Sequence, residues 1–208
     1  MRTVLVANRK GGVGKTLISV TLASALANRS KKVALADADK QRSSIEWLHR
    51  RPALARRITG LDWSSGSHIG EAPKKIEWLV IDAPGAVKGA RAEKLISEAH
   101  AVLCPVQPSF FDSASTASFL EQIDEIKRVR KGRVGVHMVM NRIRPNSKAK
   151  RELEEFLKGL GREPLAWLSE RAAYGEYAAE GLGIFDRDLK ALDPLKEQWT
   201  PILNAIDA

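Results

Sequence analysis

A glycine-rich stretch near the amino terminus carries two lysines and a threonine at spacings that suit the binding of a nucleoside triphosphate. It reads Lys-Gly-Gly-Val-Gly-Lys-Thr over residues 10–16. Glycines permit backbone conformations that point successive N–H groups at phosphate oxygens. Lys15 can reach the β- and γ-phosphates, and the Thr16 hydroxyl can ligate Mg²⁺. The stretch therefore predicts a phosphate-binding loop.

This loop departs from the plain phosphate-loop pattern, which has a glycine five positions before the Gly-Lys pair. Arg9 occupies that position, and a second lysine, Lys10, follows it. An apolar run over residues 3–7 comes before the loop, and a helical pattern begins near Lys15. The start of that helix adds the positive end of its dipole. Taken from spacing alone, Lys10 could equally be a solvated loop residue.

Three carboxylates follow apolar runs at positions where a parallel sheet places its ligands. Asp37 and Asp39 come after the run at residues 32–36, and Asp82 ends the run at residues 76–82. An apolar strand that ends in aspartate suits Mg²⁺ bound directly or through water. Two structural alternatives stay open, since Asp37 could be a buried structural carboxylate and Asp39 could cap the next helix.

Short apolar runs alternate with longer helical patterns, which predicts an α/β fold: a mostly parallel twisted sheet with helices on both faces. Strands are predicted near residues 3–7, 32–36, 76–82, 101–106, 134–141 and 164–168. Helices are predicted from about residue 15 and near residues 43–51, 91–99, 113–130, 148–160, 172–180 and 189–206, with Ser113 as an N-cap. Residues 52–75 are expected to form a loop, with an edge strand near Ile58. We expect one domain over residues 1–208.

Composition narrows the class of protein and its partners. The 208 residues include 34 Lys and Arg against 25 Asp and Glu, a net charge of +9, which favours polyanionic partners. The single cysteine, Cys104, excludes an internal disulfide and a multi-thiolate metal site within one chain. No run reaches the ~18 apolar residues that a membrane span needs, and the first apolar run is too short for a signal peptide. We expect the protein to be cytoplasmic.

These motifs resemble the ParA/MinD family of deviant Walker A ATPases, and the chain is most similar to the short ParA members. The resemblance implies a P-loop NTPase fold, ATP and Mg²⁺ as cofactors, and an ATP-dependent homodimer in which Lys10 contacts the partner's ATP. It implies catalytic roles for Lys10, Lys15, Asp39 and Asp82. It implies nucleotide contacts from Lys10, Gly11, Gly12, Val13, Gly14, Lys15, Thr16, Leu17, Asn141 and Arg142. The implied metal-binding residues are Thr16, Asp39 and Asp82.

Further positions match or depart from the family pattern. Asn141 begins the sequence Asn-Arg-Ile-Arg, which ends at Arg144. At the position of Arg144, related GTPases carry an aspartate that binds guanine. Guanine specificity is therefore not expected, and the resemblance assigns Asn141 to adenine, although it could be a turn asparagine. Lys40 replaces a family proline beside Asp39. Residues 83–85 resemble the second switch loop, and residues 105–109 resemble an element expected near the nucleotide and the dimer face.

A basic segment covers residues 127–151, with ten Lys or Arg and no Asp or Glu. The strand predicted at residues 134–141 divides it into two clusters roughly 25 Å apart. The resemblance implies non-specific DNA binding by the ATP-bound dimer, and dimerisation would double the cluster on the nucleotide side. The DNA-binding candidates are Arg144, Lys148, Lys150, Arg151 and Arg171. Each could instead be an ordinary solvated residue.

The resemblance implies a ParA-like ATPase with a weak basal rate that positions a cargo on nucleoid DNA and is stimulated by a ParB-like or other adaptor protein. The cargo could be a plasmid, a chromosome region or a protein cluster. Two alternatives are a MinD-like membrane-positioning ATPase and a metabolic P-loop ligase. The first needs a basic amphipathic C-terminal helix. The last helical pattern carries Lys196 as its one base, so we expect no membrane binding.

Overall fold

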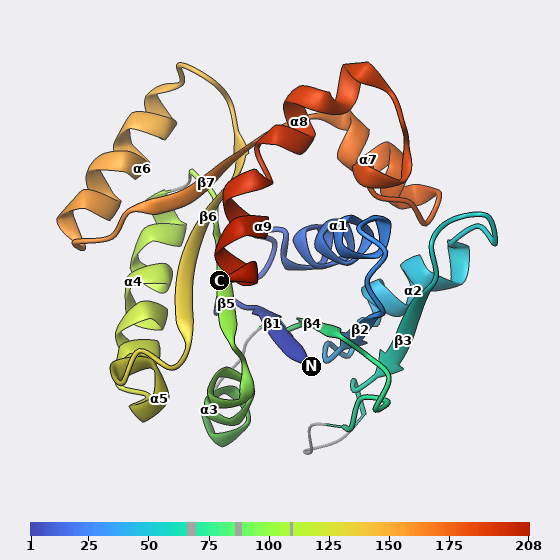
Figure 1. Cartoon of the computed structure of the whole chain (residues 1–208). Coiled ribbons are helices and arrows are strands. Elements are labelled where there is room, and N and C mark those ends of the chain that lie inside the picture. The colour runs from blue at the N-terminus through green and yellow to red at the C-terminus, as the bar shows by residue number, and fades with distance from the viewer. Residues whose placement is uncertain (66–69, 86–88, 109) are drawn as a thin grey trace.

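The computed structural model describes residues 1–65, 70–85, 89–108 and 110–208 and is built around one seven-stranded sheet (Figure 1). The strands lie in the order β3-β2-β4-β1-β5-β6-β7, and each pair of neighbours is parallel. The strands are β1 (Arg2–Val6), β2 (Val33–Asp37), β3 (Ile58–Asp62), β4 (Trp78–Asp82), β5 (Ala101–Val106), β6 (Gly135–Ile143) and β7 (Pro164–Ser169). The predicted parallel sheet is confirmed, and so is the edge strand near Ile58.

Helices cover both faces of the sheet, as the unbroken apolar character of the central strands predicts. One face carries α1 (Lys15–Asn28), α2 (Ser43–Arg50), α7 (Ala172–Ala179), α8 (Asp193–Glu197) and α9 (Thr200–Asp207). The other face carries α3 (Gly89–Glu98), α4 (Phe110–Asp124), α5 (Lys127–Arg130) and α6 (Lys148–Gly159). Figure 1 shows α3 to α6 grouped together, apart from α1 and α9.

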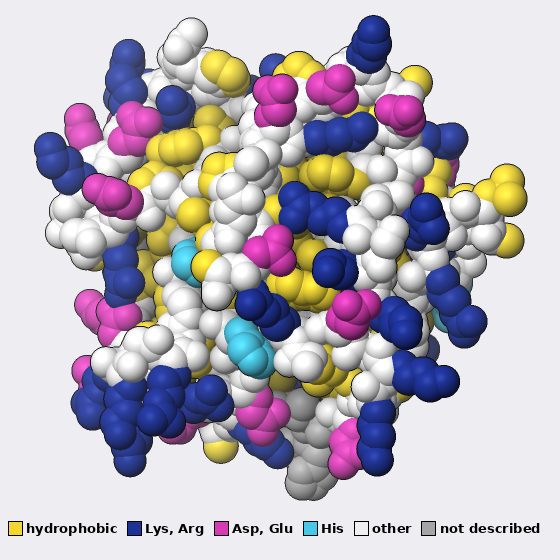
Figure 2. All heavy atoms as spheres, in the orientation of Figure 1, with side chains coloured by type: hydrophobic (Ala, Val, Ile, Leu, Met, Phe, Trp, Pro, Cys, Tyr) yellow, Lys and Arg dark blue, Asp and Glu magenta, His cyan; other side chains and the backbone are white. Residues whose placement is uncertain are grey.

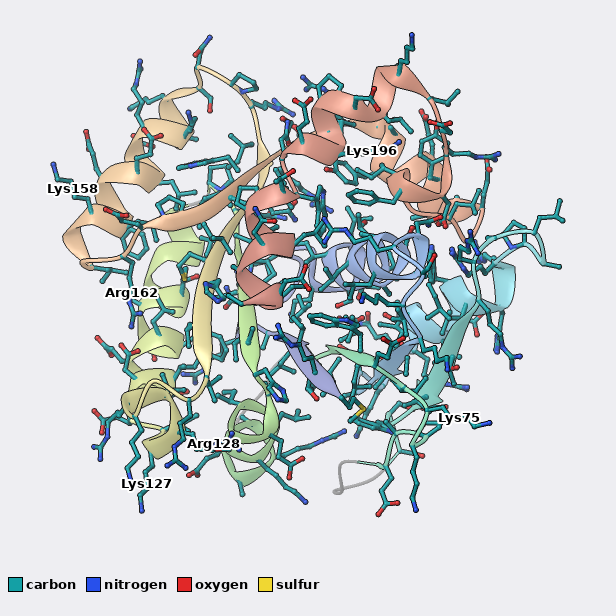
Figure 3. All side chains as sticks on the ribbon, viewed as in Figure 1. Lys75, Lys127, Arg128, Lys158, Arg162 and Lys196 are labelled. Carbon is teal, nitrogen blue, oxygen red and sulfur yellow. The ribbon has the colours of Figure 1, made fainter. Side chains whose placement is uncertain are left out.

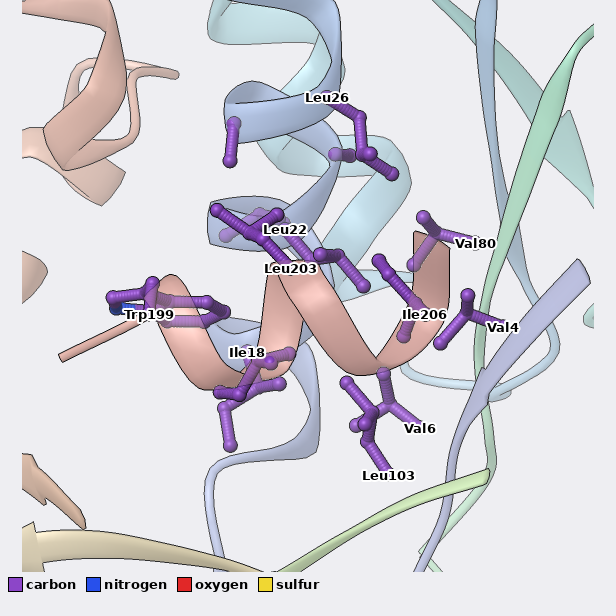
Figure 4. Packing of buried hydrophobic residues seen from close by; sticks show 14 of the residues in the cluster. Val4, Val6, Ile18, Leu22, Leu26, Val80, Leu103, Trp199, Leu203 and Ile206 are labelled. Carbon is purple, nitrogen blue, oxygen red and sulfur yellow. The ribbon is translucent and has the colours of Figure 1, made fainter. Parts of the chain in front are cut away.

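The face covered by α1 holds a core to which the carboxyl-terminal helix contributes directly (Figure 4). Trp199 and Leu203 lie against Ile18 and Leu22 of α1, Ile206 lies beside Val4 and Val80 of the sheet, and all of these side chains are buried. The indole Nε1 of Trp199 also donates a hydrogen bond to the Tyr174 hydroxyl, at 3.0 Å. Since its apolar side chains are buried, α9 is part of the fold and does not form a separate amphipathic element.

Two predicted helices are shorter than the sequence pattern suggested. The segment predicted as one helix over residues 113–130 is divided into α4 and α5, because Ile126 adopts an extended conformation and buries its side chain. The first of these helices begins at Phe110, so Ser113 lies inside it and the predicted N-cap is wrong. The segment 189–206 is likewise divided, since Pro194 and Pro201 each stand in the first turn of a new helix.

The strand order changes direction at the centre of the sheet. β1 lies between β4 and β5, so the chain crosses from β1 to one half of the sheet and later returns to build the other half. Crevices at such switch points, outside the carboxyl ends of the strands, are where open α/β sheets bind ligands. The glycine-rich loop follows β1 at this point. Within the described ranges, no helix is long and apolar enough to cross a bilayer.

Candidate nucleotide-binding site

The glycine-rich loop connects β1 to α1 and requires glycine at two places. Gly12 has φ 78° and Gly14 has φ 93°, values in the left-handed region that other residues adopt at a cost. A Cβ atom on Gly14 would lie 2.2 Å from Nδ2 of Asn141. That amide donates a hydrogen bond of 2.9 Å to the Val13 carbonyl oxygen, so β6 supports the loop from behind. The structure thus places Asn141 against the phosphate loop, and its contact with adenine stays a prediction.

Lys15 begins α1 and turns its side chain back into the loop. Its Nζ donates a hydrogen bond of 2.9 Å to the carbonyl oxygen of Lys10, so the two lysines are neighbours across the loop. Burial lowers the pKa of Lys15, while the negative charges of Asp82 and Asp39 act in the opposite direction. A buried ammonium group beside inward-facing backbone is a strong site for a phosphate anion.

Asn8 shapes the start of the loop, and our sequence reasoning did not identify it. It is fully buried, and its Oδ1 accepts a 3.1 Å hydrogen bond from the Lys10 N–H. Its Nδ2 donates to the Pro105 carbonyl oxygen at 2.8 Å. The available signal was an asparagine directly after the first apolar run, where a side-chain amide that becomes buried needs backbone partners.

The segment predicted to lie near the nucleotide does contact the loop. Gln107 donates from Nε2 to the Gly12 carbonyl oxygen at 3.0 Å, which ties the end of β5 to the phosphate loop. Ser109, the last residue of that predicted element, lies outside the described residues. The contacts of Gln107 and Asn8 together hold the loop from the β5 side.

Asp82 ends β4 beneath the phosphate loop and is buried. Its carboxylate accepts hydrogen bonds from the hydroxyls of Ser44, at 2.7 Å, Ser19, at 3.3 Å, and Thr16. Burial raises the pKa of Asp82 to about 6, although the Ser44 and Thr16 hydrogen bonds act to lower it. Thr16 and Asp82 are therefore in contact, and their binding of a metal ion stays a prediction.

Asp39 links the loop after β2 to the loop after β4. Its Oδ2 accepts a 2.9 Å hydrogen bond from the Gly85 N–H, and its Oδ1 accepts one of 2.9 Å from the Gln41 N–H. The backbone turns between Asp39 and α2 without the proline of the family pattern, through a 3.0 Å hydrogen bond from the Arg42 N–H to the Asp39 carbonyl oxygen. The exposed Lys40 therefore leaves this turn intact.

Asp37 has a structural role, which is one of the two interpretations that the sequence left open. The side chain is fully buried, and Oδ2 accepts hydrogen bonds from the backbone N–H groups of Ser44, at 2.8 Å, and Ile45, at 3.1 Å. Burial raises the pKa of Asp37, although these N–H groups and that of Asp39 lower it. Asp37 thus anchors the start of α2, which holds Ser44 against Asp82.

Two adjoining pockets lie at this edge of the sheet. One, of about 590 Å³, is lined by the phosphate loop, Asp39, Gly85 and the exposed side of α2. The other, of about 410 Å³, lies between the end of β6 and residues 169–175 and is lined in part by Asn141. Leu17 and Arg142 line both pockets. The arrangement suits a ligand with phosphates at one end and a flat ring at the other.

The residues present fit a magnesium ion that arrives with a triphosphate. The part of the chain described here has no group of three His, Cys, Asp or Glu that could hold a metal ion by itself. Mg²⁺ commonly takes one or two protein ligands and completes its shell with phosphate oxygens and water. Thr16 and Asp39 line the larger pocket, whereas Asp82 lies one layer deeper behind the Thr16 hydroxyl.

The predicted DNA-binding residues all lie at this same edge, but most of them are paired with acidic side chains. Arg144 bonds Glu170 at 2.5 Å, and Arg171 donates to the Glu170 carbonyl oxygen at 2.8 Å. In the first turns of α6, Lys148 and Lys150 lie 3.3 and 3.4 Å from glutamates four residues later. Lys150 also lies over the ring of Trp167, and Arg151 is exposed.

A glycine-rich phosphate loop at the switch point of a parallel sheet, with a buried aspartate beneath its threonine, defines a P-loop nucleotide-binding domain. The model of the CobQ/CobB/MinD/ParA nucleotide binding domain matches residues 4–184 of this chain. The chain belongs to this family.

Individual relatives are similar to this chain too, one of them over nearly its whole length. The Maintenance of carboxysome distribution protein A of Halothiobacillus neapolitanus is 27% identical over 212 residues, covering 98% of this chain and 95% of that protein. Protein ParA of Rhizobium radiobacter is 28% identical over 149 residues, covering 70% and 66% of the two chains.

Solved structures show the same fold. Apo McdA of Cyanthece superposes with a TM-score of 0.75 at 17% identity and covers 99% of both chains. The MinD cell division protein of Aquifex aeolicus gives a TM-score of 0.73 at 16% identity and covers 98% of both chains. The seven-stranded parallel sheet described above is thus the fold of ParA/MinD-type ATPases.

Proposed function

We propose that this protein is a ParA-like ATPase that hydrolyses ATP to ADP and phosphate at a weak basal rate, with Mg²⁺ as cofactor. The observation that carries the proposal is the phosphate loop with a buried Lys15 on one side and the Thr16–Asp82 pair on the other. Bound Mg²⁺ would neutralise charge on the triphosphate. Three solved structures of the same fold are titled as complexes with ATP, with an ATP analog and magnesium, and with Mg-ADP.

Each residue of the site has a defined task in this reaction. Backbone N–H groups of residues 11–15 and the Lys15 ammonium hold the β- and γ-phosphates. Thr16 offers its hydroxyl to the metal, and Asp82 accepts a hydrogen bond from that hydroxyl. Asp39 lies across the pocket and orients the water that attacks the γ-phosphorus. The bond between that phosphorus and the bridging oxygen breaks, so ADP leaves with the oxygen.

The hydrogen bond between Asp39 and Gly85 gives the site two states. In this structure the Gly85 N–H donates to Asp39. A γ-phosphate in the larger pocket offers that N–H a better acceptor, because its oxygens carry more negative charge. The exchange would release one carboxylate oxygen of Asp39 for the attacking water. The conformation of the loop after β4 would therefore depend on whether ATP is bound.

Dimerisation supplies the second lysine in this proposal. Within one chain, inward-facing amides and Lys15 already surround the near side of the phosphates. Lys10, contributed by a second copy, would neutralise charge that develops on the far side in the transition state. The dimer would therefore form with ATP and separate after hydrolysis, and its two copies would each complete the other's site.

In the ATP-bound dimer, non-specific DNA would bind across Arg144, Lys148, Lys150, Arg151 and Arg171. Contacts from such residues to phosphates give affinity without reading bases. A ParB-like or other adaptor protein bound to the cargo would stimulate hydrolysis and release the dimer from the nucleoid. Relatives named for carboxysome distribution and for partition both support a positioning role, with a protein cluster, a plasmid or a chromosome region as cargo.

The helix α9 does not supply the membrane-binding element that the MinD-like alternative needs. A membrane-binding helix needs an exposed apolar face with basic residues beside it. In α9, Ile202, Leu203 and Ile206 are buried in the core, so they offer no such face. A metabolic P-loop ligase would require a small-molecule substrate and would have no need for a second lysine at residue 10.

A mobility-shift experiment on unrelated DNA tests the proposal, with apo protein, ADP and ATP compared at one salt concentration. The DNA shift should be stronger with ATP than with ADP or without nucleotide, and it should weaken steeply as salt is added. Lys15→Ala should abolish nucleotide binding and the increase in the shift that ATP causes, because the loop loses its phosphate-binding ammonium. Lys10→Ala should retain some nucleotide binding but lose ATP-dependent dimerisation, measured by light scattering on a sizing column.

Three outcomes would contradict this assignment. If dimers form equally with ATP, with ADP and without nucleotide, ATP does not control dimerisation. ATP-dependent pelleting with liposomes and no DNA shift would favour the membrane alternative. Release of ADP only when a small-molecule substrate is added would favour the ligase.

A further inference from the structure

A second group of cations lies far from the nucleotide site, at the amino end of β6. We call it the α5 cluster, and it consists of Lys127, Arg128, Arg130, Lys131 and Arg133. Five of the seven residues from 127 to 133 are basic, and all five are exposed. Figure 2 shows Lys and Arg side chains gathered over α5, at the lower left. In Figure 3, Lys127 projects away from the body of the molecule, and Arg128 lies between α5 and α3.

The positive charge of the α5 cluster is hardly neutralised. Over the described ranges, a single ion pair reaches it, between Arg130 and Glu125 at 3.8 Å. Asp124, next to Glu125 in the chain, pairs with Arg162 instead. In contrast, the nucleotide-side candidates Arg144, Lys148 and Lys150 each have a glutamate within 3.4 Å. Unpaired cations are the ones that can release counterions when they meet a polyanion.

The positive electrostatic potential of the α5 cluster extends to the neighbouring end of β1. Burial lowers the pKa of His100, and the positive charges of the amino terminus, Arg128 and Arg2 lower it further. His100 accepts a hydrogen bond at Nδ1 from the Thr3 N–H, at 3.0 Å, so it lies beside the first strand. Positive charge is thus concentrated at this end of the sheet.

The α5 cluster and the nucleotide site lie at opposite edges of the sheet. The cluster precedes Gly135, the first residue of β6, whereas Asn141 near the end of the same strand contacts the phosphate loop. A nine-residue strand spans about 30 Å. A dimer closed over the ATP pockets would therefore leave this cluster accessible, and binding here would not need ATP.

We propose that the α5 cluster binds the sugar-phosphate backbone of nucleic acid, in any sequence and in every nucleotide state. Three arginines offer paired N–H donors to phosphate oxygens, and two lysines add point charges. Nothing in the cluster would insert into a bilayer, since Val129 is half-buried and the exposed large apolar side chains of the described chain lie elsewhere, at Met1, Leu54, Leu160 and Leu189. The inference goes beyond the proposed function, which needs DNA only in the ATP-bound dimer.

The test measures the anisotropy of a short labelled duplex of arbitrary sequence, titrated with nucleotide-free protein at several salt concentrations. One variant carries Lys127→Gln, Arg128→Gln, Arg130→Gln and Lys131→Gln. The matched control removes the same four charges from other exposed positions, with Lys31→Gln, Arg57→Gln, Lys74→Gln and Lys75→Gln. Figure 3 shows Lys75 well away from Lys127 and Arg128. A third variant changes Arg144, Lys148, Lys150 and Arg151 to Gln.

The α5 variant should bind the duplex about tenfold or more weakly, and its logarithmic salt slope should be about 3 less steep. The matched control should keep nucleotide-free binding close to that of the unmodified protein, and the third variant should lose the increase in affinity that ATP causes. An equal loss in the matched control would overturn the inference, since binding would then follow net charge alone. So would competition by polyglutamate as strong as by unlabelled duplex, or binding to anionic vesicles with no binding to the duplex.

Failure of this inference is separable from failure of the proposed function. The increase in duplex affinity on adding ATP depends on the nucleotide-side residues, so the α5 variant should retain it. If the unmodified protein shows no such increase, the proposed function fails, whereas the nucleotide-free comparison can still be made. Thermal unfolding of each variant checks that these exposed substitutions leave the fold intact.

Discussion

Gly14 shows how a single residue in this site is constrained by both local and distant structure. Its φ of 93° demands the left-handed conformation, and its missing side chain leaves room for Asn141. The amide of Asn141 in turn holds the Val13 carbonyl oxygen. A glycine at this position thus serves the turn into α1 and the packing of β6 behind the loop.

Replacing Gly14 with alanine should therefore destabilise the protein even without nucleotide. The left-handed conformation costs an L-residue about 1–2 kcal/mol, and displacement of Asn141 adds to it. We expect a loss of at least about 2 kcal/mol in the free energy of unfolding, measured by urea denaturation. Gly11→Ala is the control, since its Cβ meets nothing within 4 Å. Equal midpoints for the two variants would show that the constraint at Gly14 is absent.

Several elements are joined by the buried pair of Arg51 and Asp186. Their side chains are 6% and 2% exposed and lie 2.7 Å apart. Asp186 also accepts hydrogen bonds from Ser24 and Asn28 of α1, at 2.7 Å each. This network ties α1, the end of α2 and the segment after α7 together. Burial alone would raise the pKa of Asp186, but hydrogen bonds from Arg51, the Gly183 N–H and Ser24 lower it overall.

Asp186→Asn should lower the free energy of unfolding by about 3–5 kcal/mol near neutral pH, because a buried arginine loses its charged partner. The lowered pKa means that the folded state stabilises the carboxylate, so this contribution is complete above the ordinary value of 3.8. It disappears as pH falls through the folded-state pKa, and the two proteins should then converge. Asp207→Asn, which breaks an exposed pair with Arg29, should cost less than about 1 kcal/mol. Urea denaturation across the acid range checks both points.

The packing of the carboxyl-terminal helix α9 leads to another prediction about the free energy of unfolding. Ile206→Ala in α9 should cost about 2–4 kcal/mol in the free energy of unfolding, because it leaves a cavity between α1 and the sheet. Asn204→Ala on the exposed side of the same helix should change it by less than about 0.5 kcal/mol. If α9 instead bound a membrane, Ile206→Ala would lower the free energy of unfolding less than Asn204→Ala does, and it would weaken binding to vesicles. Thermal melts and vesicle sedimentation decide between these results.

The molecule as a whole has two cores separated by one continuous sheet. Every strand in the described part of the chain belongs to that sheet, and the central strands contribute side chains to both cores, so neither half can unfold alone without exposing the other. This supports the prediction that residues 1–208 form one domain. The opposite edges of the sheet carry different chemistry, with the nucleotide pockets at one and the α5 cluster at the other.

Calorimetry should therefore show one cooperative unfolding transition. Mg·ATP at about 100 times its dissociation constant should add about 2.7 kcal/mol to the free energy of unfolding, since it binds the folded state alone. Lys15→Ala should unfold in one transition as well but show no shift with nucleotide. Two resolved transitions in the unmodified protein would contradict the single domain.

The sequence alone determined the features that depend on local chemistry. The phosphate loop over residues 10–16, the parallel sheet and its covering helices follow from glycine spacing and from apolar runs, which act over short stretches of chain. Tertiary structure alone decided what depends on distant partners. Asp37 proved structural because α2 places two N–H groups on its carboxylate. Likewise, the nucleotide-side cations are mostly paired while the α5 cluster is not, since side-chain pairing depends on which elements the fold brings together.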